Sequence, residues 1–234
     1  MLSQHDIQEA ERSGHQVYSV YVFEAPLRIW HWMNALLMVI LAATGYLIGK
    51  PLPTLAGEAA DHYMMGYIRF AHFVAGYLFA AGLVARLYWA CVGNHHARQI
   101  FLLPFTDKEW WREVLYELRW YLFLEQTPKK YLGHNPMALL MMFFFFTVFA
   151  FGMTFTGFGL FVEFRGSGGI GDWLFGWVVP LLGGSQQTHT WHRLGMWLMM
   201  SFAVLHVYAA IREEVLSKHS LISTMISGWR MFKN

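Results

Sequence analysis

The sequence has very little cysteine and few charged residues. Cys91 is its one cysteine among 234 residues, which excludes a disulfide, an iron–sulfur cluster or a cysteine-based zinc site built from this chain alone. No Cys-x-x-Cys-His motif occurs, so thioether-linked haem is excluded as well. Charged residues make up 14% of the chain, and a net charge of +2 is too small to indicate nucleic-acid binding.

Apolar residues, in contrast, are abundant and fall in blocks. They make up 56% of the chain, and about 20 of them in a row can cross the ~30 Å hydrocarbon core of a bilayer. Four segments are long enough, at residues 29–49, 67–92, 137–161 and 188–211. We therefore predict an all-α membrane protein, a bundle of four transmembrane helices within one domain (18–234) that follows a polar segment (1–17). That polar start has no apolar core typical of a signal peptide, so the first span is expected to target the membrane and to be retained.

The basic residues predict the orientation of these spans. Two of the three connections carry only Lys50 and Arg165. Twelve basic residues lie in the N-terminal segment, the connection between the second and third spans, and the C-terminal tail: Arg12, Arg28, Arg98, Lys108, Arg112, Arg119, Lys129, Lys130, Arg212, Lys218, Arg230 and Lys233. Because cytoplasmic segments are enriched in Lys and Arg, both termini and the long connection are expected in the cytoplasm.

The connections have helical patterns of their own. Residues 107–124 repeat apolar side chains at helical spacing (Trp111, Val114, Leu115, Leu118 and Leu122). This pattern predicts an amphipathic helix, either on the cytoplasmic membrane surface or packed against the underside of the bundle. Residues 133–136, Gly-His-Asn-Pro, are expected to open the third span. The glycine-rich residues 165–187 predict a short helix or re-entrant turn.

Four of the twelve histidines lie well inside the apolar segments: His31, His72, His192 and His206, whereas His189 lies at the very end of the fourth segment. Ionisable residues within a membrane are costly and are functional candidates by default. His192 and His206 are 14 residues apart on one predicted helix, which returns within ~40° of the same face and rises ~21 Å. One such helix, with two others supplying one histidine each, would hold two stacked haems.

Depth in the bilayer predicts the pairs. His72 and His192 lie near the outer surface, and His31 and His206 lie near the cytoplasm. Two imidazoles on one iron leave no open position, which favours electron transfer over oxygen binding.

Three further residues have the position expected of haem contacts. Arg69 and Arg193 are candidates for the outer haem's propionates because guanidinium pairs well with carboxylate; the alternative is that both arginines extend to the interface. Gly45 is 14 residues after His31, where a missing side chain would let a porphyrin approach the backbone.

The other histidines are less favoured as ligands. His189 competes with His192, but it lies about 100° from the face of His206. Six others are interpreted as surface groups: His5, His15, His62, His95, His96 and His219.

At this point the sequence resembles the b-type cytochrome subunit of membrane-bound NiFe hydrogenases. The resemblance covers nearly the whole chain from about residue 18. It rests on residues 22–32 (VFEAPLRIWHW), 45–51 (GYLIGKP), 65–73 (MGYIRFAHF), 133–136 (GHNP), 189–197 (HTWHRLGMW), 212–214 (REE) and 222–225 (ISTM). More distantly, the spans resemble the cytochrome subunits of formate dehydrogenases, in which histidines at the positions of the four intramembrane histidines bind two haems.

The resemblance implies a role, partners and a location. Such subunits lie in the bacterial inner membrane, anchor a periplasmic hydrogenase through its small subunit, and pass electrons through haem b to quinone. The nickel chemistry belongs to the hydrogenase, and the chain is expected in a hetero-oligomer with its small and large subunits. The formate dehydrogenase relatives imply quinone reduction near the cytoplasmic surface, which makes His134 and Asn135 candidates for the quinone pocket; the alternative is that Asn135 only caps the third span.

Two other functions stay open from the sequence. One is the cytochrome subunit of another quinone-linked dehydrogenase. The other is a haem-free anchor or transporter with a proton path of histidines, although the spans contain no buried Asp or Glu typical of such paths.

Overall fold

The computed structural model describes residues 17–53, 56–57, 62–127, 129, 131, 133–166, 168–216 and 220–233. The polar segment predicted at residues 1–17 therefore lies outside the described residues except for Val17. So do the following basic residues and histidines: His5, Arg12, His15, Lys130, Lys218 and His219. The chain divides into two compact units: unit 1 contains residues 1–29, 89–141 and 204–234, and unit 2 contains residues 30–88 and 142–203.

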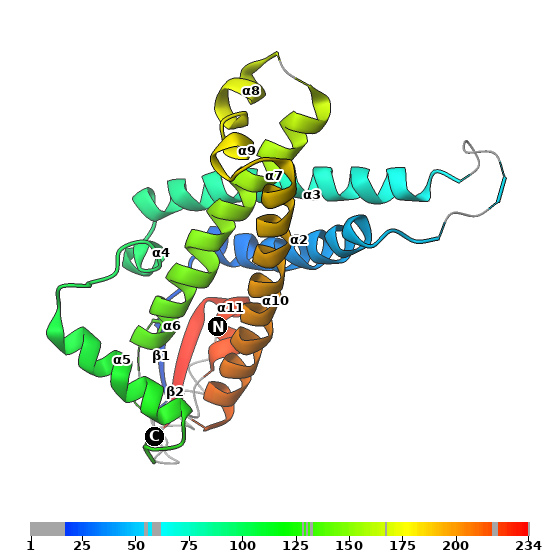
Figure 1. Cartoon of the computed structure of the whole chain (residues 1–234). Helices are drawn as coiled ribbons and strands as arrows, with labels where there is room; N and C mark the ends of the chain where they lie inside the picture. Colours follow the sequence, from blue (N-terminus) through cyan, green and yellow to red (C-terminus); the bar gives the residue numbers. More distant parts are fainter. Residues whose placement is uncertain are drawn as a thin grey trace. The chain divides into compact units, whose positions relative to one another are not determined.

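Four helices are long and apolar enough to cross a membrane, as predicted. They are α2 (Ala25–Gly49), α3 (Met64–Val92), the continuous helix Pro136–Arg165, and α10 (Ser185–Leu216) (Figure 1). Each begins before the predicted residue, and two of them also end later. The extra turns contain polar residues such as Glu163 and Glu213, which an apolar block alone does not include.

The third long helix is not uniform. It starts as α6 (Pro136–Met141), continues as a π-helical segment (Met142–Val148) and ends as α7 (Phe149–Arg165). Asn135 caps its first turn, since its Oδ1 accepts a hydrogen bond from the Ala138 amide at 2.6 Å. Proline directly after this cap lacks the amide hydrogen that a first turn leaves unused, so the helix begins here, as predicted.

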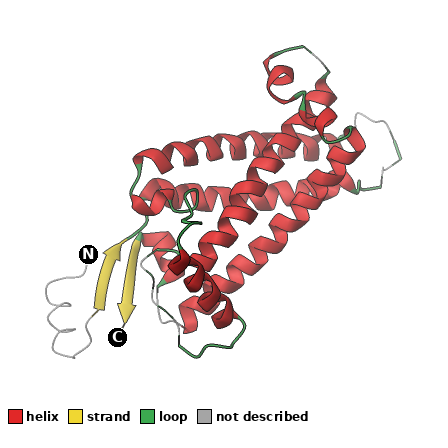
Figure 2. Ribbon diagram, turned by 60° about the vertical axis from the view of Figure 1, so that its left-hand side comes forward, coloured by secondary structure: helices red, strands yellow, loops and turns green. Residues whose placement is uncertain are grey.

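Unit 1 also contains two strands that the sequence analysis did not predict. Strand β1 (Val17–Tyr21) pairs antiparallel with β2 (Trp229–Lys233), with Tyr21 opposite Trp229 (Figure 2). Gly228, at φ +89°, accepts hydrogen bonds from the Val22 and Phe23 amides, and this backbone conformation favours glycine. The expectation of an all-α chain therefore needs one correction: the described residues form helices and, in addition, this one short pair of strands.

The connection between α3 and α6 is partly helical, and the cytoplasmic, amphipathic character expected of its helix stays a prediction. It includes α4 (His95–Arg98) and α5 (Lys108–Tyr121), and the chain ends with α11 (Leu221–Ser227) before β2. The buried face of α5 consists of Trp110, Val114, Glu117 and Trp120. Of the predicted apolar stripe only Val114 is buried, whereas Leu115, Leu118 and Leu122 are exposed. The helix therefore has a packed face and, beside it, a second, uncovered apolar face.

In unit 2 the glycine-rich connection after α7 forms two short helices, α8 (Ile170–Phe175) and α9 (Val178–Leu181). The short helix predicted there is thus present. Phe175 packs against Phe158 of α7 with ring centroids 4.9 Å apart. Val178 lies over Gly159, where an added Cβ would come within 3.0 Å of the valine Cβ. This close packing holds the connection against the end of α7.

Candidate functional site

Two of the four intramembrane histidines face each other within unit 2. His72 of α3 and His192 of α10 have ring centroids 6.4 Å apart and ring planes at 75°. Two imidazoles bound to opposite sides of one metal ion, with metal–nitrogen bonds of about 2 Å, would have centroids about 6 Å apart. The separation therefore leaves room for a metal ion between the rings, so the pair fits the two axial ligands that a haem iron needs.

A threonine hydroxyl holds each of these rings. Thr44 Oγ1 lies 2.8 Å from His72 Nδ1 and donates its own hydrogen to the Ile40 carbonyl at 2.6 Å. Thr156 Oγ1 lies 2.8 Å from His192 Nδ1 and donates to the Gly152 carbonyl at 2.8 Å.

Because a hydroxyl has a single hydrogen, a threonine that donates to the carbonyl of its own helix accepts from the histidine, and this puts the proton on Nδ1. The lone pair of Nε2 is then available for a metal, the arrangement typical of metal-ligating histidines.

A glycine follows each threonine and makes room for the same histidine ring that the threonine contacts. A Cβ added to Gly45 would lie 3.1 Å from His72 Cε1, and one added to Gly157 would lie 3.2 Å from His192 Cε1. Both contacts are tighter than ordinary van der Waals contact. Thr-Gly on α2 thus supports His72 of α3 in the same way that Thr-Gly on α7 supports His192 of α10. The sequence analysis named Gly45 but missed Thr44, Thr156 and Gly157.

The neighbouring candidates of this pair have other contacts. Arg193 is exposed and donates from Nη2 to the Gly49 carbonyl at 2.9 Å, where its charge also complements the C-terminal end of α2. Arg69 is exposed on α3. His189, the alternative to His192, bonds back to the Ser185 carbonyl at 2.9 Å. The structure therefore brings His192, and not His189, to His72.

The second predicted pair is divided between the two units. His31 lies half-buried on α2 in unit 2, with its ring centroid 5.1 Å from that of Trp32. His206 lies half-buried on α10 in unit 1. Their depth in the membrane and their pairing both stay predictions.

The quinone candidates His134 and Asn135 lie in unit 1 at the start of α6. Asn135 Nδ2 donates to the Tyr121 hydroxyl at 3.4 Å, while its Oδ1 caps α6. The His134 ring packs 5.1 Å from that of Phe23. Arg230 Nη1 donates to the Gly133 carbonyl at 2.6 Å and so holds this loop against β2. The capping role that the sequence also allowed for Asn135 is therefore present in the structure.

A groove lies on the α10 side of the same unit. It has a volume of about 350 Å³ and is lined by Phe123, Tyr208, Ile211, Arg212, Val215 and Leu216. Its one charged lining residue, Arg212, is buried and donates to the Trp120 carbonyl at 2.8 Å. The guanidinium also lies 5.0 Å from the centre of the Tyr121 ring. Tyr121 thus connects this arginine to Asn135.

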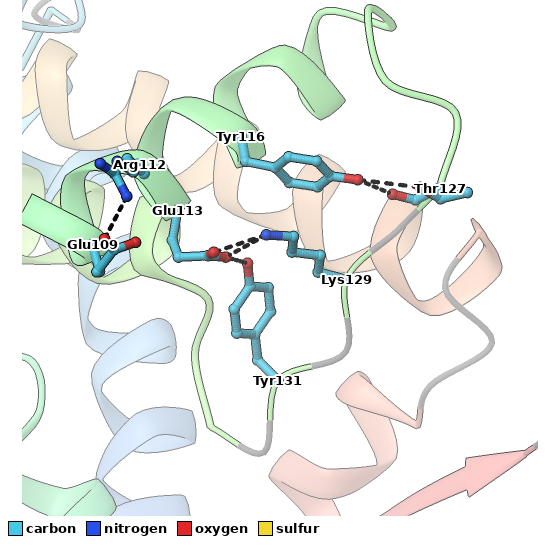
Figure 3. Close-up of polar contacts among 7 residues, drawn as sticks. All are labelled: Glu109, Arg112, Glu113, Tyr116, Thr127, Lys129 and Tyr131. Carbon is cyan, nitrogen blue, oxygen red and sulfur yellow. Dashed lines mark hydrogen bonds and ion pairs between the residues drawn. The ribbon is translucent and has the colours of Figure 1, made fainter.

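A cluster of polar side chains connects α5 with the segment before α6. Lys129 Nζ is 2.8 Å from Glu113 Oε1, and the Tyr131 hydroxyl donates to Glu113 Oε2 at 2.8 Å (Figure 3). The bond from Lys129 is the main reason why the pKa of Glu113 is below its usual value. Burial and the bond to Glu113 together raise the pKa of Tyr131. Glu113 is therefore ionised and Tyr131 protonated at neutral pH.

Comparison with known proteins identifies relatives along nearly the whole chain. A family model described as prokaryotic cytochrome b561 matches residues 22–228. A probable Ni/Fe-hydrogenase B-type cytochrome subunit of Azotobacter vinelandii is 61% identical over 216 residues, which cover 92% of this chain and 90% of that protein. The subunit of that name from Cupriavidus necator is 51% identical over 225 residues (96% and 92%). The probable Ni/Fe-hydrogenase 1 B-type cytochrome subunit of Escherichia coli K12 is 47% identical over 227 residues (95% and 95%).

Proposed function

We propose a specific electron path for this chain, which belongs to the prokaryotic cytochrome b561 family and is the B-type cytochrome subunit of a Ni/Fe hydrogenase. It is a membrane electron-transfer subunit, and a B-type cytochrome binds haem b. In the proposed path, electrons enter from the hydrogenase small subunit, pass two haem b sites one after the other, and leave to quinone. The formate dehydrogenase and haem-free alternatives receive no support from these relatives.

The observation that carries this proposal is the pair His72 and His192. Their ring centroids lie 6.4 Å apart, and each Nδ1 lies 2.8 Å from a threonine hydroxyl that can accept its hydrogen, so each Nε2 is available for iron. Haem b, when bound, supplies a one-electron redox centre. The chain's own part is to hold two neutral imidazoles at a fixed separation and to exclude side-chain volume at Gly45 and Gly157.

The second haem site is proposed at His31 and His206. His206 follows His192 by 14 residues on α10, and the ~21 Å rise between them would carry electrons across most of the ~30 Å hydrocarbon core. Arg69 and Arg193 are proposed near the propionates of the His72/His192 haem. Arg193 has donors left for this role, since its guanidinium carries five N–H groups and the bond to Gly49 uses one of them.

The basic residues support an orientation with both termini in the cytoplasm. His72 and His192 would then lie near the periplasmic face of the bacterial inner membrane. The small subunit would dock there, against the connections at residues 50–65 and 164–187. Crosslinks from the small subunit confined to residues 98–130 would contradict this arrangement.

Quinone is proposed to bind at the cytoplasmic end, beside His206. Asn135 and the groove at Arg212 lie on either side of Tyr121 there. His134 is proposed to border the quinone, since an imidazole can exchange a proton near neutral pH. In proteoliposomes, hydrogen-dependent quinone reduction would then build a membrane potential, because electrons cross inward while protons are taken up from the cytoplasm. Quinone reduction with no membrane potential would reject a cytoplasmic-side site.

Haem content tests the ligand assignment directly. We expect His72→Ala and His192→Ala each to lose one of two haems per protein, and His31→Ala and His206→Ala each to lose the other. His189→Ala is the matched control, because His189 is an exposed histidine on the same helix as His192. A haem lost in the His189 variant but kept in the His192 variant would refute the assignment.

A further inference from the structure

Glu117 is a carboxyl group buried inside unit 1. It lies on α5, is 2% exposed, and is flanked on the buried face of that helix by Val114 and Trp120. Its Oε1 atom is enclosed and has no hydrogen-bond partner among the residues that the structure describes. Burying a charged carboxylate without full hydrogen bonding is costly, so the environment favours the protonated form.

The groups that face Glu117 come from three elements. Glu113 lies one turn earlier on α5, Lys129 and Tyr131 come from the segment before α6, and Glu213 comes from α10. Burial is the largest influence and raises the pKa of Glu117 to about 7. The two carboxylates raise it further, whereas Tyr131 and Lys129 lower it. Near neutral pH this carboxyl group therefore both releases and takes up a proton.

A chain of proton-carrying groups connects Glu117 to the surface. The side chain of Glu113 is 36% exposed, and the Tyr131 hydroxyl bonds to it at 2.8 Å (Figure 3). The same hydroxyl also lies near enough to the Glu117 carboxyl to lower its pKa. Because a phenol both donates and accepts, Tyr131 can pass a proton from one carboxyl group to the other without a net change of its own.

On its inner side, Glu117 is close to the groups proposed around quinone. It lies one helical turn before Tyr121 on α5, and the Tyr121 hydroxyl accepts the bond from Asn135. Trp120, on the same buried face, donates to Glu213 at 2.7 Å. Tyr121 and Arg212 in turn border the groove on α10. Glu117 thus lies between a solvent-accessible carboxylate and the proposed quinone site.

We propose that Glu117 delivers protons from the cytoplasm to quinone, taking them up through Glu113 and Tyr131. The inference rests on the proposed quinone reduction at this end of the chain. Reduction of one quinone consumes two electrons, which hydrogen oxidation supplies, and two protons, which form the two O–H bonds of the quinol. For each proton, the Glu117 carboxyl breaks its O–H bond and becomes a carboxylate, and a proton from solvent then restores it.

The test uses the whole hydrogenase complex with the variant Glu117→Gln, which keeps the shape but cannot release a proton. Glu109→Gln is the matched control, because Glu109 lies on the same helix with its side chain 73% exposed. We expect hydrogen to reduce the haems of both variants as in the wild type. The rate of quinone reduction by hydrogen should fall roughly 100-fold in Glu117→Gln alone, the lower end of what a positioned proton donor contributes.

An infrared pH titration of the wild-type complex provides a readout that needs no variant to fold. A band of a protonated carboxyl group should disappear with a midpoint near pH 7, and it should be absent from Glu117→Gln and shifted in Glu117→Asp. A wild type without such a band overturns the inference. Equal quinone reduction in Glu117→Gln and Glu109→Gln also overturns it, while leaving the proposed electron path intact. A wild-type complex that reduces its haems but not quinone refutes the proposed function itself.

Discussion

The threonine hydroxyls beside His72 and His192 should tune the haem that these histidines hold. Thr44→Val and Thr156→Val keep the side-chain shape but remove the acceptor that lies 2.8 Å from each Nδ1. An Nδ1–H that donates to an acceptor makes the opposite nitrogen more basic, and this stabilises the ferric form. Removing the acceptor should therefore raise the reduction potential of this haem.

The size of the effect follows from the strength of one hydrogen bond. A net contribution of about 0.5–1.5 kcal/mol is typical, and only the difference between the two oxidation states changes the potential. If half of this free energy is lost in the ferric state alone, the reduction potential rises by about 10–30 mV, since 1.4 kcal/mol corresponds to about 59 mV for one electron. Haem affinity should also fall, by about 10-fold, as it does when the outer partners of other metal ligands are removed.

The assay is a redox titration of the purified subunit, followed by the visible absorption of the reduced haem. Thr190→Val is the control, because the Thr190 hydroxyl donates to the Gln186 carbonyl on an exposed face of α10 and is bonded to no histidine in the described structure. The two site variants should shift one haem upward and leave the other unchanged. Shifts equal to that of Thr190→Val would refute the inferred tautomer.

Three more outcomes are expected. Gly45→Val places a branched side chain where a Cβ alone would lie 3.1 Å from His72 Cε1, so haem per protein should fall, whereas Gly76→Val, at a helical glycine with no atom within 4 Å of an added Cβ, should keep full occupancy. Glu213→Ala leaves Arg212 buried without its carboxylate, so thermal melts should show a loss of stability of up to about 3–5 kcal/mol; an unchanged melt would show that the pair is not needed. The raised pKa of Glu117 means that the folded chain binds a proton more tightly than the unfolded chain. Stability should therefore fall by up to about 3 kcal/mol as the pH rises from 4.5 to 7, and a Glu117→Gln variant with the same pH dependence would contradict this.

The four long helices could be predicted because each contains a single continuous block of apolar residues. A run of about 20 apolar residues leaves a chain no other stable conformation in a bilayer. Their ends extend further than predicted because a helix can continue beyond its apolar block into polar residues such as Glu163 and Glu213. The pairing of β1 with β2 joins residues more than 200 positions apart, and a five-residue strand carries no signal that names such a distant partner.

The site was predicted only in part, because contacts between two helices cannot be derived from the spacing of residues along one helix. The 14-residue spacing of His192 and His206 is a property of one helix, so it can be read from the chain. Thr44 and Thr156 are different, because a threonine in an apolar helix ordinarily bonds to its own carbonyl four residues earlier, and both do so here. Their second bond, to a histidine on another helix, depends on how two helices pack.

Glu117 illustrates the same limit in unit 1. On helix α5 the stripe of Leu115, Leu118 and Leu122 predicts the buried face, and a glutamate next to it would be interpreted as solvated. The structure instead buries Trp110, Val114, Glu117 and Trp120 and leaves the leucines exposed. A helix at a membrane surface has two apolar environments available, the lipid and the rest of the protein. Hydrophobicity alone cannot decide between them. A carboxyl group on such a helix can therefore face the protein, as Glu117 does near Tyr131 and Lys129, which favour its charged form.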